Sequence, residues 1–447
     1  MLRVAVVGSG PSGCYTAQSL VQLDNDVFVD VLDRLPCPYG LVRYGVAPDH
    51  EKIKSLQNNL RTVLEHERVR FLGGVQVGPE GVPAARLREL YHAVVYCMGA
   101  ATDRHLGIPG EDLPGSWSAT EFVSWYSAHP DAVDDGFVIG ARSAVVIGVG
   151  NVAVDVTRML ARGTAELSPT DMPQGALTAL AASRVTDISM VGRRGPSQAR
   201  FTTKELRELG TLPDTEVAVD PEELALDPAY SDPSGLPAPQ RRNIEALRGW
   251  AEAPAREARH RIRLRFFLRP VELLAEAGHV AKVRFERTAP DGRGGVTGTG
   301  RYEDIDAHLV LRSVGYRGVP LDGLPFDPTT GTVPHSAGRV LREGLVSPGE
   351  YVAGWIKRGP TGVIGTNRSD AKETVTSLLA DVSALVREAV PEDPLTALRA
   401  EGLEPVEWTG WCAIERAEAE LGASLGRGVV KLPDWQSLMN AAHSSAR

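Results

Sequence analysis

The stretch MLRVAVVGSGPSGC, residues 1–14, decides the fold of this chain. Its β-branched and small apolar residues predict a strand that runs into Gly8, Gly10 and Gly13, and residues 15–23 then predict a helix. In this order Gly8 permits the tight turn, Gly10 lets backbone approach a pyrophosphate, and Gly13 lets the helix pack closely on the strand. The helix N-terminus adds unpaired N–H groups for the phosphate.

A carboxylate follows at the distance that such a site requires. Residues 27–32 predict a second strand, and Asp33 stands at its end, about twenty residues after Gly13. An acid in that place accepts a hydrogen bond from a ribose hydroxyl. The stretch therefore predicts a dinucleotide site, and the alternative is a glycine turn that only connects strand and helix.

A second opening of the same kind follows at residues 144–153, AVVIGVGNVA, before a predicted helix over residues 154–161. Alanine replaces the third glycine, which the fingerprint allows. The matching second strand, residues 187–192, ends not in an acid but in Arg193 and Arg194. Two guanidiniums can bind a 2′-phosphate in bidentate fashion, so this site is predicted to prefer NADP(H). The alternative is a solvated arginine pair at a strand end.

Composition bounds the remaining possibilities. The 447 residues are too many for one core, and a net charge of −9 argues against a general nucleic-acid binder. No stretch predicts a membrane span, and no export signal precedes the first strand. The cysteines are scattered, which fits a reducing cytoplasm and predicts neither a metal site nor a redox disulfide. They are Cys14, Cys37, Cys97 and Cys412.

Other segments give coarser predictions. The proline-rich residues 35–50 predict an ordered loop, and residues 351–366 predict a strand entering a glycine-rich loop that either approaches a ligand or simply joins strand to helix. Helices are predicted over residues 53–65, 244–260 and 369–389, short strands over 69–72 and 75–77, a buried strand over 91–99, a surface segment over 213–239, and an antiparallel hairpin or meander over 261–267, 280–287 and 301–311.

Six arginines cluster between residues 256 and 269, a local excess on an acidic chain. Such a run is either a solvated face or a docking surface for an acidic protein. The members are Arg256, Arg259, Arg261, Arg263, Arg265 and Arg269.

Together these residues resemble the adrenodoxin-reductase-type ferredoxin–NADP⁺ reductases, a branch of the glutathione-reductase-like flavoproteins. The resemblance spans residues 3 to about 435 in family order. The matching motifs are YGLVR (39–43), GVAPDH (45–50), GNVA (150–153) with Asp155, VGRRGP (191–196), FTTKELREL (201–209), GW (354–355) and GVI (362–364).

The resemblance implies an α/β fold with two Rossmann-like dinucleotide-binding domains, the NADP domain being inserted in the FAD domain. The implied boundaries are 1–105 and 319–447 for FAD and 106–318 for NADP. FAD would be held by Gly8, Gly10, Ser12, Gly13, Asp33, Leu41, Val77, Trp355, Gly362, Val363 and Ile364. NADP would be held by Val149, Gly150, Asn151, Val152, Arg193, Arg194, Glu205 and Gly362.

The same resemblance places His50 near the isoalloxazine ring, with Glu208 as its acidic counterpart; the alternative for His50 is a purely structural role. Asp33 stands where the family usually has glutamate. The implied reaction is hydride transfer from NADPH to FAD, then single-electron transfer to an acidic ferredoxin-type iron–sulfur protein, with a cytochrome P450 system further downstream. No metal site is expected.

Two other functions compete with this one. A flavin-dependent disulfide reductase would need a cysteine pair beside the flavin, and Cys14 and Cys37 are not spaced for that. An NADPH-binding redox sensor or assembly subunit would share the nucleotide sites without turnover of its own.

Overall fold

The computed structural model describes residues 1–100, 102–132, 136–137, 140–385 and 393–444. Its contacts divide the chain into two compact units. Unit 1 comprises Met1–Thr102, Ser127–Asp131 and Tyr316–Arg447, and unit 2 comprises Asp103–Tyr126 and Ala132–Gly315. The chain leaves unit 1 at the short strand β5 (Thr102–Asp103), returns to it briefly over Ser127–Asp131, and enters it again at β15 (Tyr316–Arg317).

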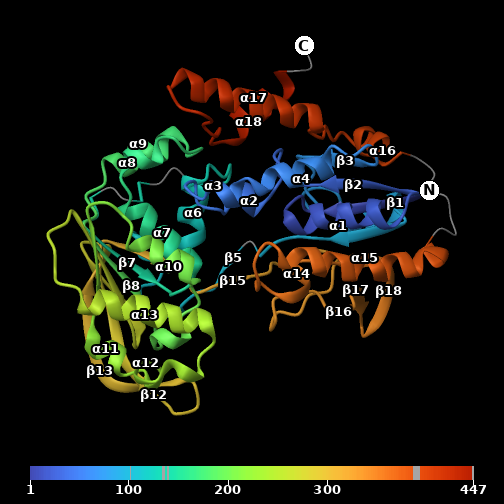
Figure 1. The fold of residues 1–447 in the computed structure, drawn as a ribbon. Helices are drawn as coiled ribbons and strands as arrows, with labels where there is room; N and C mark the ends of the chain where they lie inside the picture. Colours follow the sequence, from blue (N-terminus) through green and yellow to red (C-terminus); the bar gives the residue numbers. More distant parts are fainter. Residues whose placement is uncertain (101, 133–135, 138–139, 386–392, 445–447) are drawn as a thin grey trace. The chain divides into compact units, whose positions relative to one another are not determined.

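Unit 1 is built on a seven-stranded sheet of order β16-β17-β18-β4-β1-β2-β3 (Figure 1). Strands β18, β4, β1, β2 and β3 are parallel, and β16 and β17 are antiparallel additions. The strands are β1 (Leu2–Val7), β2 (Val27–Leu32), β3 (Val69–Leu72), β4 (Ala93–Tyr96), β16 (His335–Ser336), β17 (Arg339–Arg342) and β18 (Leu345–Val352). The helices are α1 (Pro11–Leu23), α2 (Leu41–Tyr44), α3 (Glu51–Lys54), α4 (Leu56–Leu64), α5 (Ala84–Leu90), α14 (Trp355–Arg358), α15 (Thr366–Leu385), α16 (Pro394–Ala400), α17 (Trp408–Ser424) and α18 (Trp435–Ser444).

Strand β1 shows why this sheet needs helices on both faces. Val4 and Val6 enter the core formed with α1, α4, α15 and α17, whereas Ala5 and Val7 enter a second core with α5 and α16. Successive side chains of a strand point to opposite faces, so an apolar run such as residues 4–7 is buried on both.

Unit 2 carries a six-stranded parallel sheet of order β6-β14-β7-β8-β10-β9. Helices cover one face, and a three-stranded antiparallel sheet, β11-β12-β13, packs on the other. The strands are β6 (Ser116–Ser118), β7 (Ser143–Ile147), β8 (Asp187–Val191), β9 (Thr215–Val219), β10 (His260–Arg265), β11 (Leu268–Glu276), β12 (His279–Pro290), β13 (Val296–Asp306) and β14 (Leu309–Arg312). The helices are α6 (Ala119–Tyr126), α7 (Asn151–Ala161), α8 (Thr164–Leu167), α9 (Gln174–Ala181), α10 (Thr203–Leu209), α11 (Pro221–Ala225), α12 (Pro228–Ser231) and α13 (Ala238–Glu252), with 3₁₀ turns η1 (Pro196–Gln198) and η2 (Pro233–Gly235).

The strands and helices that flank both glycine turns are confirmed, as are the strand over 69–72 and a buried strand within 91–99, but several other element predictions are wrong. The helix expected over 53–65 is two helices, α3 and α4, and the strand expected over 75–77 is reduced to one isolated bridge between Val77 and Val82. The helix expected over 244–260 starts earlier and ends at Glu252, because Ala253 has extended backbone before Pro254. The last residues of the helix expected over 369–389, from 386 onward, lie outside the described residues.

The region after α10 differs most from expectation. Residues 213–239 contain β9, the edge strand of the parallel sheet. Residues 261–267 do not belong to an antiparallel meander, because β10 pairs in parallel with β8 and β9. Strand β11, which was not expected, takes that place in the antiparallel sheet.

Candidate functional site

The turn after β1 is held in a conformation that only glycine permits. Gly8 has φ +108°, and a Cβ at Gly13 would lie 1.8 Å from the Gly8 carbonyl oxygen. The sequence folds this way locally because Pro11, which has no N–H to satisfy, occupies the first turn of α1. A Cβ at Gly10 would come no closer than 3.8 Å to other atoms of the chain. A Cβ at Gly10 would thus only touch the Gly40 backbone, and Gly10 directly precedes α1, whose N-terminal N–H groups can bind a phosphate.

Asp33, at the end of β2, is bonded to this turn. Its Oδ2 accepts from the Ser9 amide at 2.8 Å and the Ser9 hydroxyl at 2.5 Å, and its Oδ1 accepts from the Leu35 amide at 2.9 Å. Burial raises the pKa of Asp33 above its ordinary value, against these hydrogen bonds, which lower it. Two carboxylate oxygens offer about four acceptor positions, so Asp33 can fix the turn and still accept from a ribose hydroxyl.

The predicted loop 35–50 is ordered and joined to the same turn. The Tyr39 amide donates to the Ser9 carbonyl at 3.1 Å, and Gly40, with φ +49°, comes so close that its Cβ would lie 2.9 Å from the Gly10 Cα. His50 is buried at the N-terminus of α3, where its amide donates to the Ala47 carbonyl at 3.0 Å. The loop therefore places His50 by backbone contacts.

A buried ion pair ties this loop to the C-terminal part of the chain. Arg43, on α2, donates to the Glu418 carboxylate on α17 at 2.6 and 3.1 Å, and its guanidinium lies 5.0 Å from the centre of the Trp411 ring. Lys431 donates to the Arg43 carbonyl at 2.6 Å. The C-terminal helices thus hold the loop that carries Leu41 and His50.

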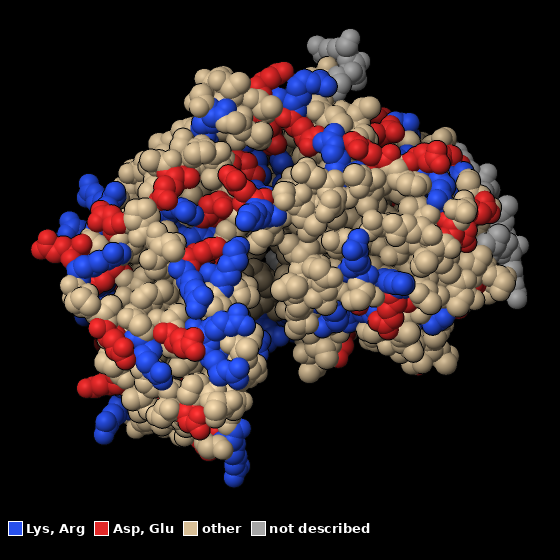
Figure 2. Space-filling view, in the orientation of Figure 1, with Lys and Arg blue, Asp and Glu red and all other residues tan. Residues whose placement is uncertain are grey.

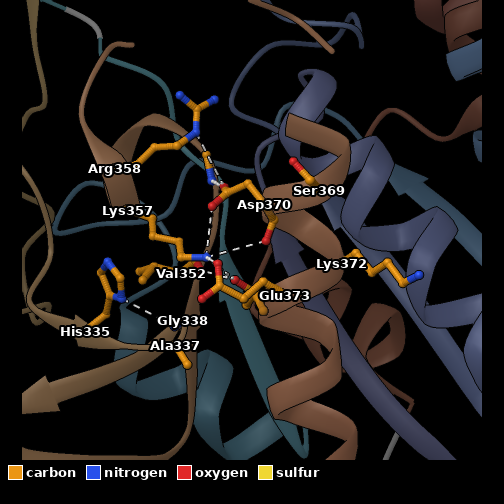
Figure 3. Close-up of polar contacts among 12 residues, drawn as sticks. His335, Ala337, Gly338, Val352, Lys357, Arg358, Ser369, Asp370, Lys372 and Glu373 are labelled. Atoms are coloured by element: carbon orange, nitrogen blue, oxygen red, sulfur yellow. Dashed lines mark hydrogen bonds and ion pairs between the residues drawn. The ribbon is translucent and has the colours of Figure 1, made fainter. Parts of the chain in front are cut away.

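The glycine-rich segment after β18 is fixed by a second buried ion pair (Figure 3). Asp370, on α15, accepts from the Gly354 amide at 2.5 Å, and its other oxygen lies 2.9 Å from the Lys357 ammonium. Lys357 also donates to Glu373 at 3.0 Å and to Thr374 at 3.1 Å. Gly354 itself has φ +80°, and a Cβ there would lie 2.5 Å from the Ser12 hydroxyl oxygen.

The contacts of Gly354 bring together residues that are far apart in sequence. Ser12, at the start of α1, lies beside Gly354, which directly precedes Trp355. The Trp355 ring stacks on the Tyr316 ring, with 5.5 Å between the ring centres. Beyond them Gly362 has φ +83°, and Val363 is 68% exposed. Val363 is thus an apolar side chain that is exposed rather than packed in the core.

Replacing Lys357 with methionine is expected to lower the free energy of unfolding by about 3 kcal/mol, because the buried Asp370 would lose its nearest cation and keep only Arg358, at 3.8 Å. Denaturant unfolding of the purified protein measures this change. Lys372→Met is the matched control: Lys372 lies on α15, the helix of Asp370, is exposed and points away from the cluster (Figure 3), so we expect a change within about 0.5 kcal/mol. Equal effects of the two substitutions would contradict this account.

Unit 2 contains the second glycine turn. Gly148 has φ +141° and a Cβ there would lie 2.1 Å from the Ser313 carbonyl oxygen, whereas a Cβ at Gly150 would meet no atom of the chain within 4 Å. Asn151, the first residue of α7, accepts from the Thr202 amide at 2.8 Å through its side chain. Open space therefore lies beside Gly150 at the N-terminus of α7.

Arg193 and Arg194 follow β8 beside this turn. Their carbonyls accept from Thr288 at 2.9 Å and from the Phe267 amide at 3.3 Å, while no carboxylate within the described parts of the chain contacts either guanidinium. Partial burial and the neighbouring Arg193 and Arg200 lower the pKa of Arg194 below its ordinary value. The backbone thus fixes two cations that no carboxylate of the described residues contacts.

Glu205 and Glu208, on α10, share a buried cation that the sequence analysis did not identify. The Arg158 guanidinium, on α7, lies 2.9 Å from Asp155, 3.1 Å from Glu208 and 3.6 Å from Glu205. Its side chain is only 1% exposed. Arg158 holds the two glutamates of α10 against α7, the helix that begins at the glycine turn. The sequence signal for an ion-paired Arg158 is its position three residues after Asp155 on the same helix.

The cysteines do not form a reactive pair. All four are free thiols, and Cys14, Cys37 and Cys97 are buried. Burial raises the pKa of Cys37 to about 11 and that of Cys97 to about 12, so neither is a thiolate near neutral pH. This chemistry does not support a dithiol reductase.

The chain thus carries two glycine turns. The strand after the first turn is followed by Asp33, and the strand after the second is followed by Arg193 and Arg194. The chain matches the family model described as pyridine nucleotide-disulphide oxidoreductase over residues 2–193. It is 44% identical to the NADPH-ferredoxin reductase FprA of Mycobacterium tuberculosis, over 98% of each protein. It is 40% identical to the mitochondrial NADPH:adrenodoxin oxidoreductase of Arabidopsis thaliana, over 99% of this chain and 95% of that protein.

The chain belongs to the adrenodoxin-reductase-type NADPH–ferredoxin reductase family. A solved structure of the Mycobacterium tuberculosis FprA in complex with NADPH agrees with this membership: it has a TM-score of 0.93 and 42% identity, over 99% of each chain. The family and the fold class predicted from the sequence are thereby confirmed. No helix in the described ranges is both long and apolar enough to cross a membrane.

Proposed function

We propose that this member of the NADPH–ferredoxin reductase family transfers a hydride from NADPH to FAD and passes electrons singly to a ferredoxin-type iron–sulfur protein. The observation that carries the proposal is the presence of two glycine turns in one chain. The first has Asp33 at the end of its second strand, and the second has Arg193 and Arg194 there. The protein's contribution is to bind and orient the two cofactors.

The residues of unit 1 fit FAD. Gly10 directly precedes α1, whose N-terminal N–H groups suit a pyrophosphate, and Asp33 keeps acceptor positions for a ribose. We assign residues 1–105 and 319–447 to the FAD domain. The proposed contacts are Gly8, Gly10, Ser12, Gly13, Asp33, Leu41, Val77, Trp355, Gly362, Val363 and Ile364. Bound there, FAD would supply the step from two-electron to one-electron chemistry.

The residues of unit 2 fit NADP(H). Space lies open beside Gly150 at the start of α7, and two guanidiniums without carboxylate partners in the described residues stand at the end of β8. We assign residues 106–318 to the NADP domain. The proposed contacts are Val149, Gly150, Asn151, Val152, Arg193, Arg194, Glu205 and Gly362.

His50 and Glu208 are the side chains that we propose act at the reacting end of the nicotinamide. Each can hydrogen-bond a carboxamide or a ring substituent and so orient the ring for hydride transfer. His50 is placed by the loop that Arg43 and Glu418 secure, and Glu208 is ion-paired with Arg158. Neither role requires a metal.

For the protein partner we propose an acidic ferredoxin, with a cytochrome P450 system as a further acceptor downstream. The arginine run 256–269 is not the best docking surface. Most of it is ion-paired inside unit 2: Arg261 with Glu216, Arg263 with Asp187, Arg265 with Glu223, and Arg269 with Glu286. Figure 2 likewise shows acidic and basic side chains interspersed over the visible face. Arg241 and Arg242, exposed on α13, are better placed, because neither side chain contacts a carboxylate within the described residues.

The test of the proposal is cytochrome c reduction with NADPH, the purified protein and a candidate ferredoxin as carrier. We expect activity that requires the ferredoxin, and a KM for ferredoxin that rises about 10-fold between about 0.05 M and about 0.5 M salt, because salt screens docking between opposite charges. Activity independent of added ferredoxin would contradict the assigned acceptor. A KM that does not respond to salt would contradict electrostatic docking.

We also propose a cytoplasmic location. Four free cysteines, three of them buried, fit a compartment in which thiols stay reduced.

A further inference from the structure

The arginine pair at the end of β8 has a third neighbour to which nothing above assigns a role. Arg200 follows η1 and is exposed. It lies between the motifs VGRRGP (191–196) and FTTKELREL (201–209), so the family resemblance implies nothing about it. Its place in unit 2 depends on the loop that connects β8 to α10.

That loop is bonded directly to the glycine turn. The Arg200 amide donates to the Val149 carbonyl at 2.8 Å, and two residues later the Thr202 amide donates to the Asn151 side chain at 2.8 Å. Val149 also packs against the start of the arginine pair, since a Cβ at Gly192 would lie 3.0 Å from a Val149 methyl group. Gly192, the residue before Arg193, and the backbone of Arg200 therefore both contact Val149 of the turn.

The intervening residues form a rigid connection. The Gly195 amide donates to the Gln198 side chain at 3.0 Å, and the Ser197 amide donates to Asp227 at 2.8 Å. A Cβ at Gly195 would lie 2.4 Å from the Asp227 carboxylate, so the chain passes that residue closely. Arg200 is thus fixed in relation to Arg194 by hydrogen bonds on both sides of η1.

The charges at this corner are not balanced by the protein. In the described part of the chain no carboxylate contacts the side chain of Arg193, Arg194 or Arg200, whereas Arg261, Arg263 and Arg265 of the same unit each have one. Partial burial lowers the pKa of Arg194, and Arg193 and Arg200 contribute to this shift. Like charges held together are unfavourable until a multiply charged anion binds between them.

We infer that Arg200 is a third cation for the 2′-phosphate of NADP(H) and thereby a determinant of the preference for NADPH over NADH. The inference rests on the proposed function of the arginine pair and extends it to a residue held by a separate loop. Arg193 and Arg194 follow the strand directly, while Arg200 reaches the same corner through its bond to Val149.

The test measures binding of adenosine 2′,5′-bisphosphate and of 5′-AMP to the flavin-containing protein by calorimetry, which does not depend on turnover. Arg200→Ala is expected to weaken adenosine 2′,5′-bisphosphate about 5-fold and to leave 5′-AMP unchanged, and Arg200→Lys to weaken it about 2-fold. Arg301→Ala is the control, because Arg301 is also exposed in unit 2 but lies on β13.

The outcomes separate this inference from the proposal beneath it. A loss confined to Arg200→Ala and to the bisphosphate supports the inference. Equal losses of affinity for the bisphosphate in Arg200→Ala and Arg301→Ala would show that any removed positive charge in unit 2 has the same effect, and would overturn the inference. Unchanged binding in Arg200→Ala, with a large loss in the Arg193→Ala/Arg194→Ala protein, would overturn it and leave the proposed function intact. Unchanged binding in both proteins would overturn the phosphate role of the pair as well.

Discussion

Replacing both Arg193 and Arg194 with alanine is expected to raise the KM for NADPH about 100-fold and to change the KM for NADH less than about 2-fold. Each guanidinium can make charge-assisted hydrogen bonds to the 2′-phosphate worth about 1.5–3 kcal/mol, and the partial exposure of the site reduces their sum to about 2.7 kcal/mol. NADH has no phosphate there, so the same substitutions remove nothing from its binding. Steady-state kinetics with ferricyanide as acceptor measures both constants.

The control for this experiment is the replacement of two arginines outside the site, Arg241 and Arg242 of α13. That double variant has the same change in net charge, and its KM values with ferricyanide are expected to match those of the wild-type protein. If the Arg193/Arg194 variant raised the KM values for NADPH and NADH equally, the pair would not distinguish the two nucleotides.

Replacing Gly10 with alanine is expected to weaken FAD binding about 100-fold without unfolding the chain. The added Cβ would meet no atom of the protein closer than 3.8 Å, so the cost of about 1–3 kcal/mol, at its upper end here, falls on a pyrophosphate that approaches the turn. The flavin content of the purified protein and its affinity for added FAD measure the effect. Gly13→Ala is expected instead to destabilise the protein, because its Cβ would lie 1.8 Å from the Gly8 carbonyl oxygen and disrupt the turn itself.

Gly175→Ala serves as the reference for Gly10→Ala. Gly175 lies in α9, and a Cβ there meets nothing within 4 Å. We expect unchanged flavin content and equal or slightly higher stability, since alanine favours a helix. Full flavin content in Gly10→Ala would mean that no cofactor approaches this glycine.

The parts of the site that could be predicted from sequence are those in which neighbouring residues act together. A turn such as residues 8–13 carries its backbone requirements within six residues, and Arg193 and Arg194 stand directly at the end of their strand. The buried contacts that secure these segments join distant positions. Arg43 and Glu418 are 375 residues apart, and Gly354 reaches Ser12 through the fold alone. No local pattern in the sequence indicates such pairs.

Strand β10 shows how a correct pattern led to a wrong topology. Residues 260–265, HRIRLR, alternate polar with apolar side chains, which is typical of an antiparallel strand with one solvated face. The strand nevertheless lies inside a parallel sheet, where Ile262 and Leu264 are buried while Arg261 and Arg263 pair with Glu216 and Asp187 of the strands on either side. Ion pairs between strands accommodated the arginines, and the sequence pattern does not show them.

The most direct test of the account is anaerobic mixing of the purified yellow protein with NADPH, followed by addition of oxidised ferredoxin. We expect NADPH to bleach the flavin absorption band rapidly, NADH to do so slowly, and ferredoxin to restore the band while it is itself reduced. Protein that binds NADPH but whose flavin stays oxidised, or that contains no flavin, would instead indicate a nucleotide-binding sensor or assembly subunit and would contradict the account.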